Sequence, residues 1–308
     1  MPFTAKDVQT LREKTGVGMM DCKKALMSSD GDMDKAIEFL REKGLAAATK
    51  KAGRIAAEGV VSAYYDEINK IGVVVEVNSE TDFVAKNVEF QSFVLSIAKT
   101  IAQYKPADVE VLSSLVLSGS DRTVLENLQD KILSIGENIK IRRFVIKEGV
   151  LSTYVHGGGT VGVMVGFETD SETAQNDIFK TMGKDVAMQI AAMSPQYLDK
   201  NSVPADVVEY EKGILLAQLK EDPKMANKPQ NVLDGIIAGK VLKLFKEMCL
   251  LEQQFVKNND LNVEQYVNAV AKEVGAEIKV TGFVRFAKGE GLQKKEDNFA
   301  DEVACMVK

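Results

Sequence analysis

The chain has 308 residues, enough for two or three compact units. Hydrophobic residues make up 45% of it, yet no window approaches the roughly 18 consecutive apolar residues of a membrane span. The formal net charge of −6, from 39 basic and 45 acidic residues, argues against broad electrostatic binding to nucleic acid. We therefore expect a globular chain without membrane or direct nucleic-acid partners.

The N-terminus, MPFTAKDVQTLREKTG, lacks the basic start and apolar stretch of a signal peptide and has the pattern of an amphipathic helix. The cysteines are odd in number and far apart, which fits free thiols in a reducing cytoplasm: Cys22, Cys249 and Cys305. With one histidine, His156, and no closely spaced cysteine pair, we expect no zinc site and no cofactor.

Residues 4–43 predict three short helices. Thr4 is a suitable N-cap for the first, and the second spans about Met20–Ser28. Asp32 can cap the third, and Gly44 is a suitable residue to end it. Such a small bundle buries little core, so we expect it to present a surface rather than to be very stable alone.

After a connector rich in Ala, Lys and Gly at residues 45–58, the pattern changes to strands. One β-branched and aromatic run surrounds Val60 and Tyr65, and Ile71–Val77 forms another, with Asp66–Lys70 as a hairpin loop. A long helix is expected after Ser79. Its apolar positions recur at helical spacing: Phe83, Phe90, Val94, Ile97, Ala98 and Ile101.

This pattern repeats at an offset of 90 residues. The string GVxSxY at residues 59–64 recurs at 149–154, and GVxV at 72–75 recurs at 162–165. Thr169-Asp170 is a shifted counterpart of Thr81-Asp82, and a second helix follows at about Glu172–Ala192. We expect two copies of one unit, each an antiparallel hairpin covered by a helix on one face.

Residues 203–257 interrupt the second copy. They predict two helices joined by a short turn, an antiparallel helical hairpin. Two interpretations stay open: the hairpin protrudes as a dimer or partner surface, or it packs back on its own core. A helix near Val263–Val274, a strand near Glu277–Phe286 and a final helix near Asp297–Val307 follow.

The sequence therefore predicts an α+β fold in which a three-helix module precedes a duplicated antiparallel sheet-plus-helix core with an inserted helical hairpin and a C-terminal helix. The expected boundaries are 1–53 for the module and linker, 54–145 for the first copy, 146–286 for the second copy with its insertion at about 203–257, and 287–308 for the C-terminal helical module.

The sequence contains little that indicates enzyme chemistry. His156 precedes three glycines, but neither G-x-x-x-x-G-K-[ST] nor G-x-G-x-x-G is present there, and the loop lies between two expected strands. The carboxylates show no acid/base spacing, and no nucleophile has an evident base. We expect no covalent chemistry, and the remaining enzyme hypothesis would depend on His156.

Two strings carry the functional signal. Residues 11–26 read LREKTGVGMMDCKKAL and residues 76–86 read EVNSETDFVAK. Both resemble the characteristic motifs of the elongation factor Ts family, and so do IRR at 141–143, HG at 156–157 and FADEVACM at 299–306. The resemblance runs in order along essentially the whole chain. The first string alone is typical of ubiquitin-associated three-helix modules.

The resemblance implies a guanine nucleotide exchange factor without covalent chemistry, whose partner is the GTPase elongation factor Tu. In the family, the matching residues intrude near the Mg²⁺ site of the GTPase and dislodge the ion: Thr81, Asp82, Phe83 and Val84. The spacing alone leaves another interpretation open, in which Asp82 is only a helix-terminus carboxylate and Phe83 a core residue. Thr169-Asp170 has no aromatic residue after it, so the second copy lacks this feature.

Further positions match partner-facing parts of the family: Arg12, Met19, Met20, Lys23, His156, Val256 and Met306. The first four would dock on the nucleotide-binding domain of the GTPase, although Met19 or Met20 could instead fill the small core and Lys23 could be solvated. Gln254 stands where the family commonly has proline, so the backbone path there is open. The alternative function is a peptide- or helix-binding adaptor. The resemblance also leaves room for a homodimer or 2:2 complex through the helical hairpin.

Overall fold

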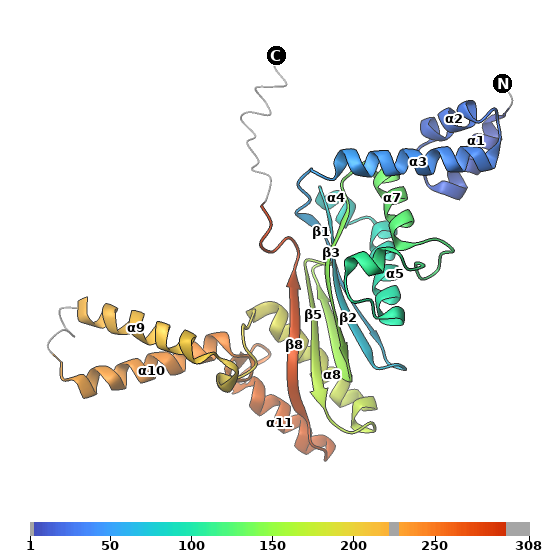
Figure 1. The fold of residues 1–308 in the computed structure, drawn as a ribbon. Helices are drawn as coiled ribbons and strands as arrows, with labels where there is room; N and C mark the ends of the chain where they lie inside the picture. The colour runs from blue at the N-terminus through green and yellow to red at the C-terminus, as the bar shows by residue number, and fades with distance from the viewer. Residues whose placement is uncertain (1–2, 222–227, 294–308) are drawn as a thin grey trace.

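The computed structural model describes residues 3–221 and 228–293. It confirms the α+β fold, with three N-terminal helices, two three-stranded antiparallel sheets and a protruding helical arm (Figure 1). The N-terminal helices are α1 (Ala5–Thr15), α2 (Met19–Ser28) and α3 (Met33–Lys51).

Local capping explains where the first helix begins and ends. The Thr4 hydroxyl accepts the N–H of Asp7 at 3.3 Å, and the Asp7 carboxylate accepts the N–H of Thr4 at 2.7 Å. Gly16 follows the helix with φ of 67°, a left-handed conformation that glycine adopts without steric cost. The three helices enclose a small core of their own: Val8, Leu11, Val17, Cys22, Ala25, Leu26, Ala36 and Leu40.

The expected end of the third helix at Gly44 is wrong. Gly44 is buried inside α3, which continues to Lys51. A Cβ on Gly44 would lie 3.5 Å from the carbonyl oxygen of Gln129 and 3.8 Å from Leu133. Both neighbours belong to α7 (Val124–Ile135), so α3 is still packed against α7 at Gly44 and connects the N-terminal helices to the rest of the molecule.

The first sheet has the order β1-β2-β3. Its strands are β1 (Glu58–Asp66), β2 (Ile71–Ser79) and β3 (Lys140–Glu148). The hairpin of β1 and β2 is confirmed, with Asp66 paired to Ile71 at the turn and Glu58 to Ser79 at the open end. The strand β3 was not expected, and it ends beyond the predicted boundary at residue 145.

The expected long helix after Ser79 is divided in two. A single turn, α4 (Asp82–Ala85), precedes α5 (Val88–Tyr104), because Asn87 interrupts the helix and caps the second part. Its Oδ1 accepts the N–H groups of Glu89 at 2.8 Å and Phe90 at 3.2 Å. The apolar face of α5 covers the first sheet as predicted, but Phe83 is not part of that face.

The second sheet has the order β4-β5-β8 and is covered by α8 and α11. Its elements are β4 (Val150–His156), β5 (Val161–Glu168), α8 (Asp177–Met193), α11 (Val263–Val274) and β8 (Lys279–Ala287). The duplication extends further than the sequence repeat indicated. The α7–β3 segment recurs 139 residues later as α11–β8, the same lengths preserved, with the arm intervening in the second copy.

The uncovered faces of the two sheets pack on each other. Gly72 and Gly162, one of the repeated pairs, lie at this contact. A Cβ on Gly72 would come 2.4 Å from the sulfur of Met164, and one on Gly162 would come 2.4 Å from a methyl of Val61. A Cβ at either position would displace a side chain of the facing sheet, so glycine at both positions favours the close approach of the sheets. The buried side chains between the sheets are Val61, Val74, Leu151, Met164 and Phe286.

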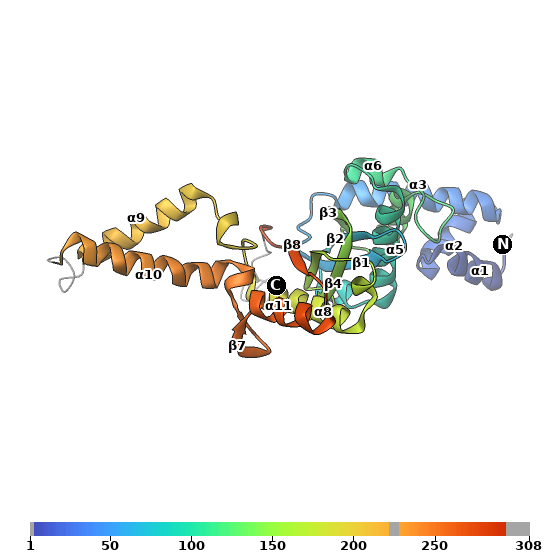
Figure 2. The same cartoon turned by 90° about the horizontal axis from the view of Figure 1, so that it is seen from below.

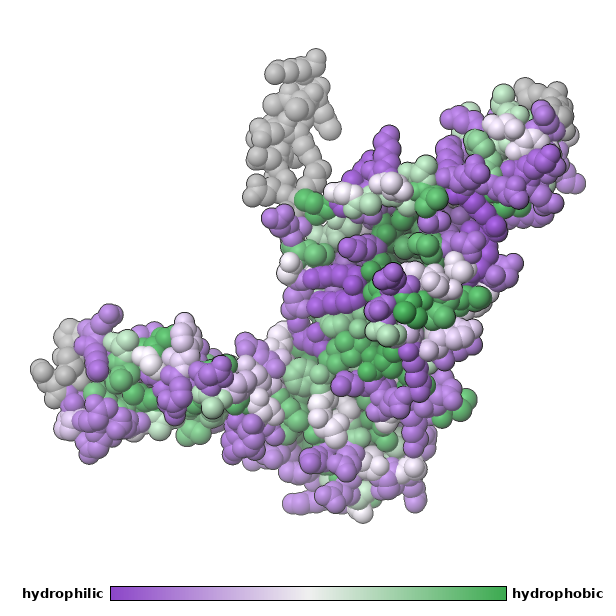
Figure 3. Space-filling model, in the orientation of Figure 1, coloured by the Kyte–Doolittle hydropathy of each residue, from purple (hydrophilic) through white to green (hydrophobic). Residues whose placement is uncertain are grey.

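The inserted arm consists of α9 (Ala205–Glu221) and α10 (Gln230–Met248), and it protrudes on the side away from the N-terminal helices in both views (Figures 1 and 2). The interpretation that it packs back on the core is wrong, because its buried apolar residues contact each other: Leu219, Leu233, Ile237 and Val241. The visible face of the arm carries both hydrophobic and hydrophilic side chains (Figure 3).

At the base of the arm, Gln254–Phe255 pairs with Asn258–Asn262 in a small two-stranded sheet of β6 and β7. The final helix expected near Asp297–Val307 lies outside the described residues. Within the described residues, no helix is both long and apolar enough to span a membrane. The four-part division of the chain remains a proposal.

Candidate partner interface

The tip, which we define as residues 80–83, follows β2 at the open end of the β1–β2 hairpin (Figure 1). The side chain of Phe83 is 80% exposed there, so the interpretation of Phe83 as a core residue is wrong. Val84, the next residue, is buried against the helix-covered face of the first sheet. The structure thus presents an aromatic ring to solvent on a turn anchored by its own neighbour.

Thr81 has the backbone geometry of an N-cap, but its side chain does not cap α4. Instead its hydroxyl donates to Oε1 of Glu137 at 2.6 Å. The N–H groups of Glu80 and Thr81 both donate to Oε2 of Glu137 at 3.0 Å. Sequence reasoning missed Glu137, which lies far along the chain between α7 and β3 and carries no local motif.

The contact between these two loops is reciprocal. The carboxylate of Glu80 accepts the N–H of Asn138 at 2.6 Å and contacts the guanidinium of Arg54 at 3.4 Å. The side-chain amide of Asn138 in turn donates to the carbonyl of Arg54 at 2.8 Å. The tip, the α7–β3 loop and the connector before β1 are therefore held together by hydrogen bonds in both directions.

Asp82 projects from the first turn of α4 and remains about half exposed. Its carboxylate pairs with Lys86 one turn later at 2.6 Å. This hydrogen bond and the nearby positive charges of Lys86 and Lys288 hold the pKa of Asp82 below its ordinary value. Asp82 is therefore a stable negative charge beside the exposed ring of Phe83.

His156 ends β4, and the three glycines after it form the turn to β5, as expected. This turn lies at the same end of the molecule as the tip, because Val61 near the start of β1 donates its N–H to Gly159 O at 2.8 Å. The imidazole of His156 is exposed, and its Nδ1 lies 3.0 Å from the hydroxyl of Tyr154.

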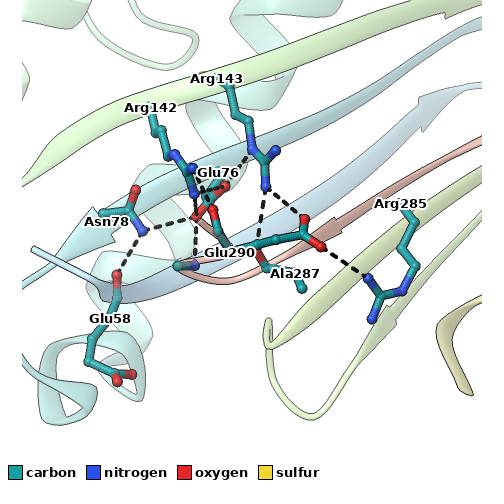
Figure 4. A network of polar contacts seen from close by, with 9 residues as sticks. Glu58, Glu76, Asn78, Arg142, Arg143, Arg285, Ala287 and Glu290 are labelled. Atoms are coloured by element: carbon teal, nitrogen blue, oxygen red, sulfur yellow. Dashed lines mark hydrogen bonds and ion pairs between the residues drawn. The ribbon is translucent and has the colours of Figure 1, made fainter. Parts of the chain in front are cut away.

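A buried carboxylate fixes the two sheets at this end. Glu76 of β2 is fully buried and paired with Arg142 at 3.0 Å and Arg143 at 2.7 Å (Figure 4). It also accepts the N–H of Gly289 at 2.8 Å. Gly289 belongs to a strap, residues 287–291, that runs from β8 of the second sheet onto the first. The strap also brings Lys288 to Glu58 at the start of β1.

The exposed face of α2 carries the predicted docking residues. Met19 is 45% exposed and Met20 63% exposed, so the interpretation that they fill the small core is wrong. Arg12 is exposed on α1, whereas Lys23 is half-buried. These positions share the N-terminal bundle, and α1 and α2 do not adjoin the small sheet that contains β7 (Figure 2).

Val256 occupies the turn between β6 and β7 and is 44% exposed. Its N–H donates to Oε1 of Gln189 at 2.9 Å, and the fully buried side chain of Gln189 also donates to Gln254 O at 3.1 Å. The backbone at Gln254 thus continues as a strand anchored to α8. Met306, the last predicted position, lies outside the described residues.

The described residues contain no group of three or more His, Cys, Asp or Glu side chains arranged to hold a metal ion. The site consists instead of surfaces: an exposed aromatic ring beside a carboxylate, an exposed imidazole at the same end, and separate apolar patches. Such an arrangement can bind a protein partner at several points, but it offers no nucleophile with an adjacent base.

Comparisons with known proteins agree with the sequence motifs. The family model described as Elongation factor TS matches residues 80–290. The chain is 48% identical to Elongation factor Ts of Syntrophotalea carbinolica over the full length of both. It is 48% identical to that of Clostridium kluyveri over 99% of both chains, and 49% identical to that of Clostridium novyi over 97% of both. These matches give no support to a homodimer. The chain belongs to the elongation factor Ts family of translation elongation factors.

Proposed function

We propose that this chain is a guanine nucleotide exchange factor that binds elongation factor Tu in its GDP form and promotes GDP release in the cytoplasm. The observation that carries the proposal is the 80% exposed Phe83 on a tip anchored by Glu137. A hydrophobic ring held in water by a rigid turn is a surface suited to insertion into a partner.

The mechanism is differential binding. In a GTPase of this kind, GDP is held by phosphate contacts and by Mg²⁺, which bridges phosphate and protein oxygens. A factor that prefers the state with these contacts broken lowers GDP affinity, and bound GDP must lower the factor's affinity by the same ratio. A factor that binds both states equally shifts nothing.

Phe83 and Asp82 would act together in this step. Burial of the Phe83 side chain in an apolar gap of the partner is worth about 1.5–3 kcal/mol, which can offset displaced packing there. Asp82, kept ionised by Lys86, would bring a negative charge toward the metal and phosphate site. Arg12, Met19, Met20, Lys23, His156 and Val256 would supply binding contacts that hold the tip in place.

The test is release of fluorescent GDP from purified elongation factor Tu, with the full chain at subsaturating concentration. Phe83→Ala should slow release by roughly ten- to a hundredfold, the kinetic equivalent of a lost burial energy of about 1.5–3 kcal/mol. Ile68→Ala is the matched control, because Ile68 is 92% exposed on the turn at the opposite end of the same hairpin. It should leave release unchanged. Equal release by the parent and Phe83→Ala would contradict the assignment of the tip.

The alternative, an adaptor that binds peptides or helices, draws on the exposed methionines of α2, Met19, Met20 and Met27. It predicts a chain that binds its partners through α2 and leaves GDP release at the spontaneous rate. A Met20→Ala chain distinguishes the two: under exchange it should still reach the full release rate at a higher concentration.

A further inference from the structure

Glu137 receives three hydrogen bonds from the tip, and no residue of the tip motif lies near it in sequence. We infer that Glu137 is a positioning residue that sets the orientation of the tip for exchange, a role that rests on the function proposed above. Glu137 does not touch the partner in this account. It acts through Thr81 on the direction in which Asp82 and Phe83 project.

The carboxylate is well placed for this task. It follows Gly136, which ends α7 with φ of 86°, so the chain turns sharply toward the tip. One oxygen, Oε2, accepts two consecutive backbone N–H groups at 3.0 Å, and the other accepts the Thr81 hydroxyl at 2.6 Å. Bonds to two successive peptide groups fix the backbone orientation immediately before α4, which a single side-chain contact would not.

The second copy of the unit provides an internal comparison. The α7–β3 segment corresponds to α11–β8 at a constant spacing, which places Gly275 at the position of Gly136 and Ala276 at that of Glu137. Both glycines end their helices with positive φ. Alanine cannot accept the bonds that Glu137 accepts.

In the second copy, the loop that corresponds to the tip begins at Thr169, and it is built differently. The buried hydroxyl of Thr169 has no hydrogen-bond partner among the described residues. Asp170 accepts the N–H groups of Glu172 and Thr173 at 2.9 and 2.8 Å, so its loop closes on itself. Among the described residues, the first copy combines the clamping carboxylate with an exposed aromatic ring, and the corresponding loops of the second copy do not. This co-occurrence associates Glu137 with the function of the tip and not with the shared fold.

The physical consequence concerns preorganisation. A tip without Glu137 would leave two N–H groups to water and would sample several orientations, and ordering it on the partner would cost part of the binding energy of Phe83. Because the tip is proposed to promote GDP release, the loss of its fixed orientation should lower the maximal rate of GDP release. Docking through the N-terminal helices should change little.

The experiment compares Glu137→Ala, Glu137→Gln and the control Glu126→Ala. Glu126 lies at the other end of α7 and also accepts two bonds from a threonine, the N–H and hydroxyl of Thr123 at 2.9 and 3.0 Å. Its removal weakens the same helix without touching the tip. For each full-length chain, fluorescent-GDP release from elongation factor Tu gives the maximal rate and the half-saturating concentration. Amide hydrogen exchange of the free chain follows Glu80 and Thr81.

Glu137→Ala should lower the maximal release rate by about tenfold and speed exchange of the Glu80 and Thr81 amides by at least as much. Glu137→Gln retains an accepting oxygen and should stay within about threefold of the parent. Glu126→Ala should keep the parent's maximal rate. Equal loss in Glu126→Ala and Glu137→Ala, or no loss in Glu137→Ala, overturns the role of Glu137 alone. A parent chain that does not accelerate release overturns the exchange function, and this role with it.

Discussion

Phe83 and Val84 are consecutive residues of one helical turn, yet Phe83 is 80% exposed and Val84 only 8% exposed. The ring of Phe83 faces solvent, while the side chain of Val84 belongs to the same buried core as Phe90 and Ile97 of α5. In this turn, Phe83 is therefore exposed to solvent, while Val84 holds the turn against the core. Substitutions at the two positions should separate function from stability.

Val84→Ala should lower the free energy of unfolding by about 1–2 kcal/mol, because it removes buried methyl groups. Phe83→Ala should change it by less than about 0.5 kcal/mol, since the ring is exposed. Urea denaturation of the two variants and the parent measures both values. Greater destabilisation by Phe83→Ala than by Val84→Ala would mean that the ring contributes to the core after all.

Glu76 predicts a pH dependence of stability. Burial raises the pKa of Glu76, but the hydrogen bonds that its carboxylate accepts outweigh burial and hold the pKa below the ordinary value of 4.5. The donors, from the largest effect on the pKa to the smallest, are Gly289, Asn78, Arg143 and Arg142. A carboxyl whose pKa is lower in the folded state contributes its full stabilisation at any pH above its pKa in the unfolded chain. For Glu76, this stabilisation is lost as the pH falls below 4.5 toward the pKa of the folded state.

Glu76→Gln should therefore destabilise the protein by about 2–4 kcal/mol near neutral pH, because it leaves Arg142 and Arg143 without their buried partner. The gap to the parent should narrow as the pH is lowered from about 7 to about 3. Urea denaturation across this pH range gives the unfolding free energy of the parent and of Glu76→Gln. The difference between the two at each pH removes the contribution of the other carboxylates, which both chains share. A gap that stays constant with pH would contradict the ionised pairing.

The strap offers a matched pair of glycines. Gly289 and Gly291 have φ of 68° and 74°, so alanine is strained at both. A Cβ on Gly289 would also lie 2.2 Å from the carbonyl oxygen of Ala57, whereas one on Gly291 has 3.8 Å to Arg142. Gly291→Ala should cost about 1–2 kcal/mol, and Gly289→Ala clearly more. Thermal denaturation ranks them, and the reverse order would argue against close contact of the strap with the first sheet.

His156 should matter for association and not for folding. Its imidazole is exposed and contacts Tyr154 through Nδ1 at 3.0 Å. His156→Ala should leave the unfolding free energy within about 0.5 kcal/mol and weaken binding to elongation factor Tu several-fold. Calorimetric titration measures the affinity, and Tyr154→Phe tests whether the hydroxyl orients the ring. Unchanged affinity in His156→Ala would remove this residue from the interface.

The sequence predicted the paired strands because their signal is local. Runs of β-branched and aromatic residues and the 90-residue repeat identify β1, β2, β4 and β5, and the repeated Gly72 and Gly162 are now explained by contact between the sheets. The strand β3 was missed because its repeat partner β8 lies at a different offset, displaced by the arm. An insertion hides a duplication from any search at one fixed spacing.

The sequence predicted the ends of helices that are set by a capping residue next to the helix. It did not predict those that depend on packing against a distant part of the chain. Thr4 and Asp32 cap their helices as expected. Gly44 looked like a terminator, but packing on α7 keeps it helical. Asn87 was the available signal for the break between α4 and α5, and Asn176 caps α8 in the same way.

The candidate site was predictable only in part. Phe83, Asp82 and His156 were identified through family resemblance, and the structure adds their exposure. Glu137 could not be found this way, since its contact with Thr81 joins residues far apart in sequence. Long-range hydrogen bonds to backbone groups leave no spacing pattern to recognise.

The most direct test of the exchange proposal is the affinity of this chain for elongation factor Tu, measured with the GTPase free of nucleotide and again with saturating GDP and Mg²⁺. GDP should weaken the association by the same factor by which the chain weakens GDP binding. Phe83→Ala should shrink this factor. An affinity that is the same with and without GDP, while the tip engages the GTPase, would contradict the exchange proposal.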